Sequence, residues 1–341
     1  MTNYLDDFVV AQMQEHHIPG LSLAVIGDGK IAKAQGYGFT DQMEKSPVTT
    51  ATLFQAASIS KCLAALAALR LVDQGRLALD EDLDTKLQSW KIPPNEFNKN
   101  ELITLRRLLS HNAGFTVHGF RGYVPGQSIP TLAQILNGIP PASNPAIRLD
   151  VIPGTHPRYS GGGYTVLQQL LIDTTGLPFP ELMQSLVLQP LGMASSTFEQ
   201  PLPRDFERAA ATGHAQNGKP ITGGAHLYPE MAAAGLWTTP SDLACFVIGI
   251  QQSLASQSRA VLSAAITREM LTLHSTTHGL GPFVTGNGKT LKFFHSGRNA
   301  GFDALLMAQA ETGKGLVIMT NANADPKVLN TILKAIVMEN P

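Results

Sequence analysis

The feature of this sequence that most constrains its fold is the placement of two strand pairs at opposite ends of the chain. Residues 21–26 and 30–38 are strand-like and flank an Asp28-Gly29 turn, which is a strong hairpin signal. Residues 302–310 and 316–321 form a second such pair. Between about 58 and 200 the apolar residues instead recur with a helical period. This order predicts an α+β fold in which both chain ends build one antiparallel sheet around a helical insertion.

Each end of the chain also carries a predicted helix. One runs toward His17, and the other begins near Pro326 with Asp325 as its cap. We expect both helices to flank the sheet. A length of 341 residues allows two independent domains. The pattern predicts one split domain instead, with residues 1–57 and 201–341 forming an α/β subdomain and residues 58–200 forming a mainly helical one.

Composition excludes several classes of protein. The chain has 25 Lys and Arg against 26 Asp and Glu, for a net charge of −1, and no basic run exceeds Arg106-Arg107, which argues against a nucleic-acid partner. No apolar run approaches the roughly 18 residues of a membrane span. The first seven residues lack the basic and apolar regions of a signal peptide. We therefore expect no signal peptide in this chain and leave the compartment open between the cytoplasm and a periplasmic or secreted location after signal removal. With two cysteines, Cys62 and Cys245, we expect buried free thiols.

Ser58 and Lys61 form the most informative motif. A spacing of three residues at the start of a predicted helix places both side chains on one face. A serine hydroxyl becomes a good nucleophile when a neighbour takes its proton, and a lysine can do so when burial lowers its pKa. The residues after Lys61 are almost all apolar, so we expect this lysine to be partly buried. Such pairs also arise by chance, and the alternative is a solvated helix start with Ser58 as N-cap.

Two further polar segments are candidates for a site. Tyr159 precedes the glycines at 161–163 in a predicted loop before a helix, where glycine permits close approach of the backbone. His295 lies in the segment 293–302, which is typical of the end of a strand entering a turn, and the N–H groups that follow His295 could donate to an oxyanion. The alternatives are a turn with a packed aromatic ring and a polar strand end.

Taken together, these residues give the chain a family resemblance. It resembles the serine β-lactamase and penicillin-binding protein superfamily, and within it the branch of class C β-lactamases, D-alanyl-D-alanine carboxypeptidases and β-lactamase-like carboxylesterases. Three motifs follow in the family's order: Ser-x-x-Lys at Ser58 and Lys61, an altered Tyr-x-Asn at Tyr159, and Lys/His-x-Gly at His295. Segments at 18–20, 103–111, 190–193 and 234–243 also resemble family blocks. The likeness spans about residues 18 to 321 and implies a β-lactamase/transpeptidase-like fold.

The resemblance also implies a role for each motif residue. Ser58 is expected to be the acylated nucleophile and Lys61 its hydrogen-bonded partner and base. Tyr159 is expected to relay a proton to the leaving group and to activate water for deacylation. The backbone N–H groups of Ser58 and Arg298 are expected to form the oxyanion hole. The residues expected to contact substrate are His295, on the acyl or carboxylate side, and Ser296, Gly297 and Gly161.

Two positions depart from the family pattern. Gly161 stands where the family has an Asn that contacts substrate, and His295 replaces the lysine with which typical class C β-lactamases recognise the β-lactam carboxylate. Both departures favour a serine hydrolase that acts through an acyl-enzyme on carboxylic esters or D-amino-acid amides, with weak β-lactamase activity at most. The expected types are a carboxylesterase or a D-Ala-D-Ala carboxypeptidase-like enzyme. The alternative is a non-catalytic penicillin-binding, peptidoglycan-binding or sensor module of the same fold.

Other catalytic signals are weaker. The chain has no Gly-x-Ser-x-Gly elbow. His274 and His278 lack the Glu of a zinc-protease helix, and we expect them in a polar loop. The mechanism needs Ser, Lys, Tyr and backbone donors, so no cofactor and no metal is implied. The expected partner is a small-molecule ester, amide or β-lactam-like substrate, selected by loops at 115–126 and 227–231. The oligomeric state stays open.

Overall fold

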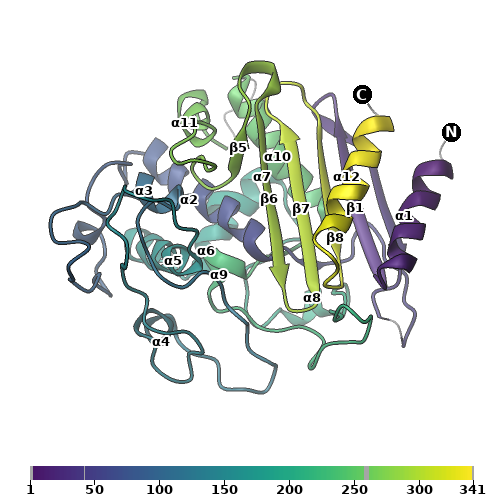
Figure 1. Ribbon diagram of the computed structural model, residues 1–341, viewed down its shortest axis with the longest axis horizontal. Coiled ribbons are helices and arrows are strands. Elements are labelled where there is room, and N and C mark those ends of the chain that lie inside the picture. Colours follow the sequence, from purple (N-terminus) through teal and green to yellow (C-terminus); the bar gives the residue numbers. More distant parts are fainter. Residues whose placement is uncertain (1–2, 42, 257–260, 340–341) are drawn as a thin grey trace.

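A six-stranded antiparallel sheet lies at the centre of the computed structural model, which describes residues 3–41, 43–256 and 261–339 (Figure 1). The N-terminal hairpin pairs with the last strand of the chain, because β1 lies between β2 and β8. The prediction that both chain ends build one sheet is therefore confirmed. In spatial order the strands are β2 (Lys30–Gly38), β1 (Gly20–Gly27), β8 (Gly315–Thr320), β7 (Phe302–Gln309), β6 (Lys292–Asn299) and β5 (Phe283–Thr285).

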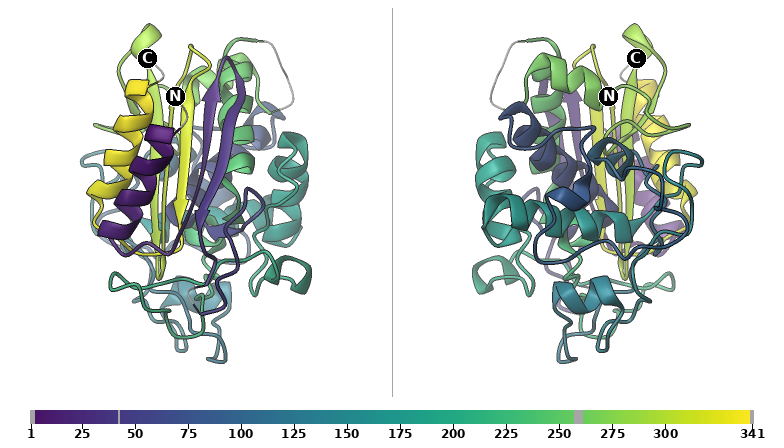
Figure 2. Two further views of the ribbon diagram at one scale, coloured as in Figure 1. Left: turned by 90° about the vertical axis from the view of Figure 1, so that its right-hand side faces the viewer. Right: turned by 90° about the vertical axis from the view of Figure 1, so that its left-hand side faces the viewer.

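The terminal helices α1 (Asn3–Glu15) and α12 (Lys327–Glu339) cover one face of this sheet (Figure 2). Apolar residues of α12 recur every three to four positions and pack with sheet residues such as Leu23 and Ile318 in a core of their own. The Asp325 carboxylate accepts a hydrogen bond from the backbone N–H of Lys327 at 2.9 Å, so the predicted cap is confirmed. These two helices leave the other face of the sheet to the rest of the chain.

The predicted helical block packs on the opposite side of the sheet. Helix α2 is buried along almost its whole length, from Ser60 to Leu71, because it lies in the main core between the sheet and the other helices. The elements of this block are α2 (Ser60–Asp73), α3 (Leu105–Leu109), α4 (Leu132–Asn137), α5 (Gly161–Thr175), α6 (Phe179–Met183), a π-helix (Gln184–Leu188) and α7 (Gln189–Leu191), with 3₁₀ helices at Ala57–Ile59 (η1) and Leu83–Thr85.

The part of the chain that follows the helical block contains little strand structure before β5. Apart from the two residues of β4 (Trp237–Thr238), which pair with β3 (Phe54–Gln55), the described residues between 201 and 282 form helices and loops. Helix α10 packs against β1 and β8 and buries most of its apolar run at 243–250. Its Cys245 is half-buried, whereas Cys62 is fully buried as predicted. The helices here are α8 (Arg204–Glu207), α9 (Met231–Ala234), α10 (Pro240–Leu254) and α11 (Ala264–Met270); the 3₁₀ helix Gly288–Thr290 follows β5.

Strand β6 positions one wall of the site. Alternation along the strand buries His295, Gly297 and Asn299 on the side of the helical block and leaves Ser296 and Arg298 exposed on the other face. His295 thus lies within the strand, and the prediction that residues 293–302 are the end of a strand entering a turn is confirmed, because β6 ends at Asn299 and a turn follows. The short strand β5 pairs with residues 292–294 of β6. The part of this edge that follows residue 294 has no strand partner among the described residues, and it borders the site.

The structure also bears on membrane insertion. Across the residues that the structure describes, no helix combines the length and the apolar character that crossing a bilayer requires.

Candidate active site

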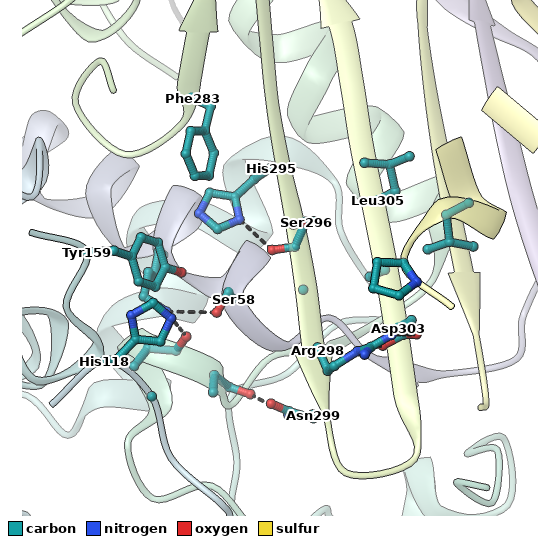
Figure 3. Close-up of a pocket in the computed structure, with 18 of the residues that line it drawn as sticks. Ser58, His118, Tyr159, Phe283, His295, Ser296, Arg298, Asn299, Asp303 and Leu305 are labelled. Atoms are coloured by element: carbon teal, nitrogen blue, oxygen red, sulfur yellow. Dashed lines mark hydrogen bonds and ion pairs between the residues drawn. The ribbon is translucent and has the colours of Figure 1, made fainter. Parts of the chain in front are cut away.

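The three sequence motifs meet at one cavity of about 510 Å³, although they are far apart in the chain (Figure 3). Ser58 and Lys61 come from η1 and the start of α2, and Tyr159 comes from the segment before α5. Strand β6 contributes His295 through Asn299. The structure therefore brings together the nucleophile, base, tyrosine and strand residues that the sequence singled out.

Ser58 lies in a strained turn that the surrounding chain holds in place. The preceding Ala57 has a φ of +49°, a left-handed conformation that costs a residue with a Cβ roughly 1–2 kcal/mol. The backbone N–H of Ala56 donates to the carbonyl of Leu236 at 2.9 Å. The Ser60 hydroxyl donates to the carbonyl of Ala57 at 2.6 Å and accepts from the N–H of Leu236 at 3.0 Å. Such strain persists where neighbouring contacts over-determine a conformation, and it is common at functional sites.

The Lys61 side chain lies beside the Ser58 hydroxyl. Its Nζ is 2.9 Å from Ser58 Oγ and 2.8 Å from the carbonyl oxygen of Ala233. Lys61 is 2 % exposed, and burial lowers the pKa of its amine to about 7. A substantial fraction of this lysine is therefore neutral near pH 7, and a neutral amine can accept the serine proton.

Tyr159 closes the other side of the nucleophile. Its side chain hydrogen-bonds to that of Ser58, and its ring centroid lies 5.1 Å from Lys61 Nζ. Burial raises the pKa of the Tyr159 phenol above its ordinary value, so the hydroxyl stays protonated near neutral pH. In that state the hydroxyl can donate a proton rather than act as a phenolate base.

Four histidine rings surround Tyr159. The ring centroids of His111 and His118 lie 4.3 and 4.9 Å from that of Tyr159, and those of His278 and His295 lie 6.1 and 6.3 Å away. The predicted loop at 274–278 is confirmed, but His278 within it is buried, and its ring lies 4.0 Å from that of Phe283. Within the described ranges, no group of three or more His, Cys, Asp or Glu side chains is arranged to hold a metal ion.

The buried histidines of this cluster are neutral. Burial lowers the pKa of His295 to about 3 and that of His278 to about 4, and it lowers the pKa of His111 well below its ordinary value. The Nδ1 atom of His295 lies 2.7 Å from the carbonyl of Ser296, which places the proton on Nδ1 and leaves Nε2 without a hydrogen-bond partner. His295 can therefore accept a hydrogen bond from a ligand, but it cannot supply the positive charge of a lysine.

Gly297 allows η1 to rest directly against β6. A Cβ at this position would lie 2.2 Å from the carbonyl oxygen of Ala56 and 3.0 Å from the Cβ of Ala57. The first distance is shorter than real Cβ contacts allow, and the second is tighter than most of them. The glycine of the third motif thus sets the distance between the strand and the turn that carries Ser58.

Replacing Gly297 with alanine is expected to lower kcat/KM for an ester substrate about 100-fold, because a shift of η1 by about an ångström misplaces the nucleophile. Turnover of a p-nitrophenyl ester and the melting temperature would be measured together. Gly27→Ala is the control, because a Cβ there meets only Ala32 Cβ at an ordinary 3.5 Å. Full activity in the Gly297 variant would show that this contact does not position Ser58.

Gly161 does not lie in the wall of the pocket. It is the first residue of α5, and its N–H donates to the carbonyl of His118 at 3.0 Å. A Cβ here would lie 3.1 Å from both the His118 carbonyl and the Phe120 ring. The loop carrying His118 and Phe120 packs over Gly161 and lines the pocket in its place.

Several pocket residues were not singled out from the sequence. The loop at 115–126 supplies His118, Gly119 and Phe120 to the pocket wall, as expected. The segment at 227–231 does not line the pocket; Ala233 and Ala234, which follow it in the chain, do. Phe283 and Asn299 also line the cavity. No local signal marks these residues, because their roles arise from chain segments that meet in three dimensions.

Asn299 joins three walls of the site. Its amide Nδ2 donates to Gln55 Oε1 at 2.8 Å and to the carbonyl of Ala234 at 3.0 Å. Gln55 lies three residues before Ser58, and Ala234 follows the residue whose carbonyl contacts Lys61. A single amide therefore ties β6 to both the nucleophile turn and the segment that holds the base.

Arg298 turns its guanidinium away from Ser58. Its Nε and Nη2 donate to the two carboxylate oxygens of Asp303 at 2.7 and 2.6 Å, and Nη2 also donates to the carbonyl of Ala324. The Arg298 side chain is therefore not directed at the reacting atoms. An oxyanion hole formed by the backbone N–H groups of Ser58 and Arg298 remains a prediction.

Comparison with known proteins places this arrangement in a family. The Beta-lactamase family model matches residues 5–337, so the chain belongs to that family. It is 26% identical over 353 residues to Protein flp of Staphylococcus aureus strain MRSA252, a match that covers 98% of this chain and 66% of that protein. The chain thus spans just under two thirds of the curated relatives that it matches first.

Solved structures share the fold. An octameric penicillin-binding protein homologue from Pyrococcus abyssi superposes with a TM-score of 0.81 at 23% identity, covering 98% of this chain and 77% of that one. A β-lactamase/D-alanine carboxypeptidase from Pseudomonas syringae gives a TM-score of 0.77 at 23% identity, covering 98% of both chains. The expected β-lactamase/transpeptidase-like fold is therefore confirmed.

Proposed function

We propose that this protein is a serine hydrolase that acts through an acyl-enzyme on carboxylic esters or D-amino-acid amides. The observation that carries the proposal is the contact of Lys61 Nζ with Ser58 Oγ at 2.9 Å, made by a buried lysine whose pKa is lowered to about 7. A surface serine near a solvated lysine would have neither the short contact nor the lowered pKa.

The acylation step begins with proton transfer from Ser58 to Lys61. In the neutral amine one N–H donates to the carbonyl of Ala233, and the lone pair accepts the Ser58 O–H. Ser58 Oγ attacks the substrate carbonyl carbon and forms a tetrahedral intermediate. The N–H groups of Ser58 and Arg298 stabilise the charge on the carbonyl oxygen. The intermediate collapses to the Ser58 ester and releases the leaving group.

Tyr159 handles the proton of the leaving group. Its protonated hydroxyl beside Ser58 donates to the departing oxygen or nitrogen and is reprotonated from the Lys61 ammonium. In deacylation the same pair removes a proton from the attacking water, and the acid product leaves with Ser58 restored. Each step uses side chains that already surround the Ser58 hydroxyl.

The neutral His295 supports ester or amide hydrolysis over efficient β-lactam hydrolysis. Its imidazole carries no positive charge to pair with the carboxylate of a β-lactam. Weak β-lactamase activity at most is the corresponding expectation.

The experiment that tests the proposal is covalent labelling combined with a substrate panel. A fluorescent fluorophosphonate and a fluorescent penicillin would be incubated with the protein, and the labelled peptide would be identified by mass spectrometry. Turnover of p-nitrophenyl esters, D-Ala-D-Ala peptides and a chromogenic cephalosporin would be measured in parallel. Labelling at Ser58 with ester or peptide turnover supports the hydrolase. No labelling and no turnover supports the non-catalytic binding or sensor module.

The variant Tyr159→Phe is expected to slow deacylation, because it removes the hydroxyl that relays protons to and from Ser58. Intact-protein mass spectrometry during ester turnover should show the acyl-enzyme accumulating, with kcat reduced about 100-fold. Tyr164→Phe is the matched control, because the Tyr164 hydroxyl donates to the carbonyl of Leu109 instead. Unchanged kcat with no accumulated acyl-enzyme would assign Tyr159 a packing role.

A further inference from the structure

The pocket continues past Ser58, across the free edge of β6, onto the other face of the sheet. There it is lined by Leu305 of β7 and by Pro326, Leu329 and Asn330 at the start of α12, which together we call the shelf. Leu305 is registered opposite Ser296. In Figure 3 Leu305 lies on the side of β6 opposite to Tyr159 and His118. A substrate bound at Ser58 can therefore extend one arm over the strand.

The surface of the shelf is apolar. Leu305 and Leu329 are 6 % and 8 % exposed, so their side chains form a packed floor rather than projecting into solvent. Asn330 at the rim is exposed and donates to the carbonyl of Pro326 at 3.3 Å. These groups favour a hydrocarbon arm, which gains free energy by leaving water.

The cationic side chains that line this pocket are already engaged by protein groups. Among the described residues that line it, the lysines and arginines are Lys61 and Arg298. Lys61 is engaged by Ser58 and Ala233, and Nε and Nη2 of Arg298 donate to the two carboxylate oxygens of Asp303, so that the positive charge of Arg298 is paired with a carboxylate. The Asp303 carboxylate also accepts the N–H of Ala324 at 2.9 Å, which holds the ion pair in place. A carboxylate placed on the shelf would lose water without gaining a counter-charge.

We propose that the shelf receives an uncharged, apolar arm of the substrate, so that uncharged esters are preferred over esters whose matching arm ends in a carboxylate. This inference rests on the proposed hydrolase function and narrows its substrate class. Neutral esters fit it, whereas peptides with a free C-terminal carboxylate on that arm do not.

The test uses two matched pairs of esters, one for each arm. p-Nitrophenyl hexanoate and the p-nitrophenyl monoester of adipic acid differ by a terminal carboxylate on the acyl arm. Methyl p-acetoxybenzoate and p-acetoxybenzoate differ by a carboxylate on the alcohol arm. The measurements are made at pH 8, above the ordinary imidazole pKa of about 6.5. In one of the two pairs the arm that differs lies on the shelf. In that pair the wild type is expected to cleave the uncharged ester with a kcat/KM about tenfold or more above that of the carboxylate-bearing ester.

Two variants at adjacent positions of α12 test whether this preference arises at the shelf. Asn330→Lys adds an ammonium at the rim of the shelf and is expected to shift the ratio of kcat/KM toward the carboxylate-bearing member about threefold in that same pair. Thr331→Lys adds the same charge at the next, exposed position of α12, outside the pocket lining, and is expected to leave the ratio unchanged.

The outcomes separate this inference from the proposed function. Equal or faster cleavage of the carboxylate-bearing member in both pairs overturns the inference alone, as does an equal response to Asn330→Lys and Thr331→Lys. If no ester is cleaved and Ser58 is not labelled, the proposed function fails and this inference fails with it.

Discussion

The variant Ser58→Ala is expected to lower kcat/KM for a p-nitrophenyl ester by at least about 10⁴-fold, because it removes the hydroxyl oxygen that carries the acyl group. Ser58 Oγ is the atom that Lys61 Nζ approaches to 2.9 Å. Fluorophosphonate labelling should disappear in the same variant, while the melting temperature stays within a few degrees of the wild type. Retained turnover would contradict the assignment of the nucleophile.

Ser60→Ala is the control for this result, because Ser60 lies two residues away in the same motif but has a different task. Its buried hydroxyl bridges the Ala57 carbonyl and the Leu236 N–H. Its loss is expected to lower the free energy of unfolding by about 1–3 kcal/mol. The folded fraction should still be labelled at Ser58. Labelling lost in Ser60→Ala at a temperature where that variant is folded would point to the wrong serine.

The variant Lys61→Met is expected to lower kcat/KM at least about 1000-fold while leaving the protein as stable as the wild type or more so at pH 6. Activity falls because methionine cannot accept the Ser58 proton. Stability does not fall because methionine fills the buried site without the desolvation penalty that a charged amine carries. Kinetics and thermal melts of the same samples would check both effects. Full activity in Lys61→Met would exclude the lysine as the base.

The pH dependence provides a second measurement on Lys61. Because burial lowers its folded-state pKa from 10.5 to about 7, the neutral base form is populated above that value, and wild-type kcat/KM should rise through pH 7 and level off. The unfolded chain binds more protons than the folded chain between pH 7 and 10.5, so wild-type stability gains from this group as pH rises through that window and loses it as pH falls. In Lys61→Met this contribution should be absent. A kcat/KM that falls through pH 7 would contradict the neutral-amine mechanism.

Much of the fold followed from local patterns. Hairpin signals at both ends of the chain predicted a shared sheet, and β1 does pair with β8. Local patterns did not give the reason for a glycine at position 297. It lies inside β6, where the backbone of Ala56 leaves no room for a Cβ.

The site shows the same division. Ser58, Lys61, Tyr159 and His295 are marked by motif spacing, and all four line one cavity. The loop at 115–126 was expected to shape the pocket, but the sequence did not single out His118 and Phe120 within it. Phe283 and Asn299 could not be predicted either, since each comes from a segment whose place depends on how distant parts of the chain pack. Gly161 shows the reverse case: its motif position suggested substrate contact, and the His118 loop covers it instead.

The sequence by itself determined the order of elements, the family and the chemical groups at the nucleophile, because these depend on short-range spacing and residue type. The tertiary structure decided their protonation states and the shape of the pocket. Burial makes Lys61 a base near neutral pH and keeps His295 neutral. The fold also pairs the Arg298 cation with the Asp303 carboxylate and forms the shelf between β7 and α12. Desolvation and charge pairing depend on what surrounds a group in space, and that environment is set by contacts between residues far apart in the chain.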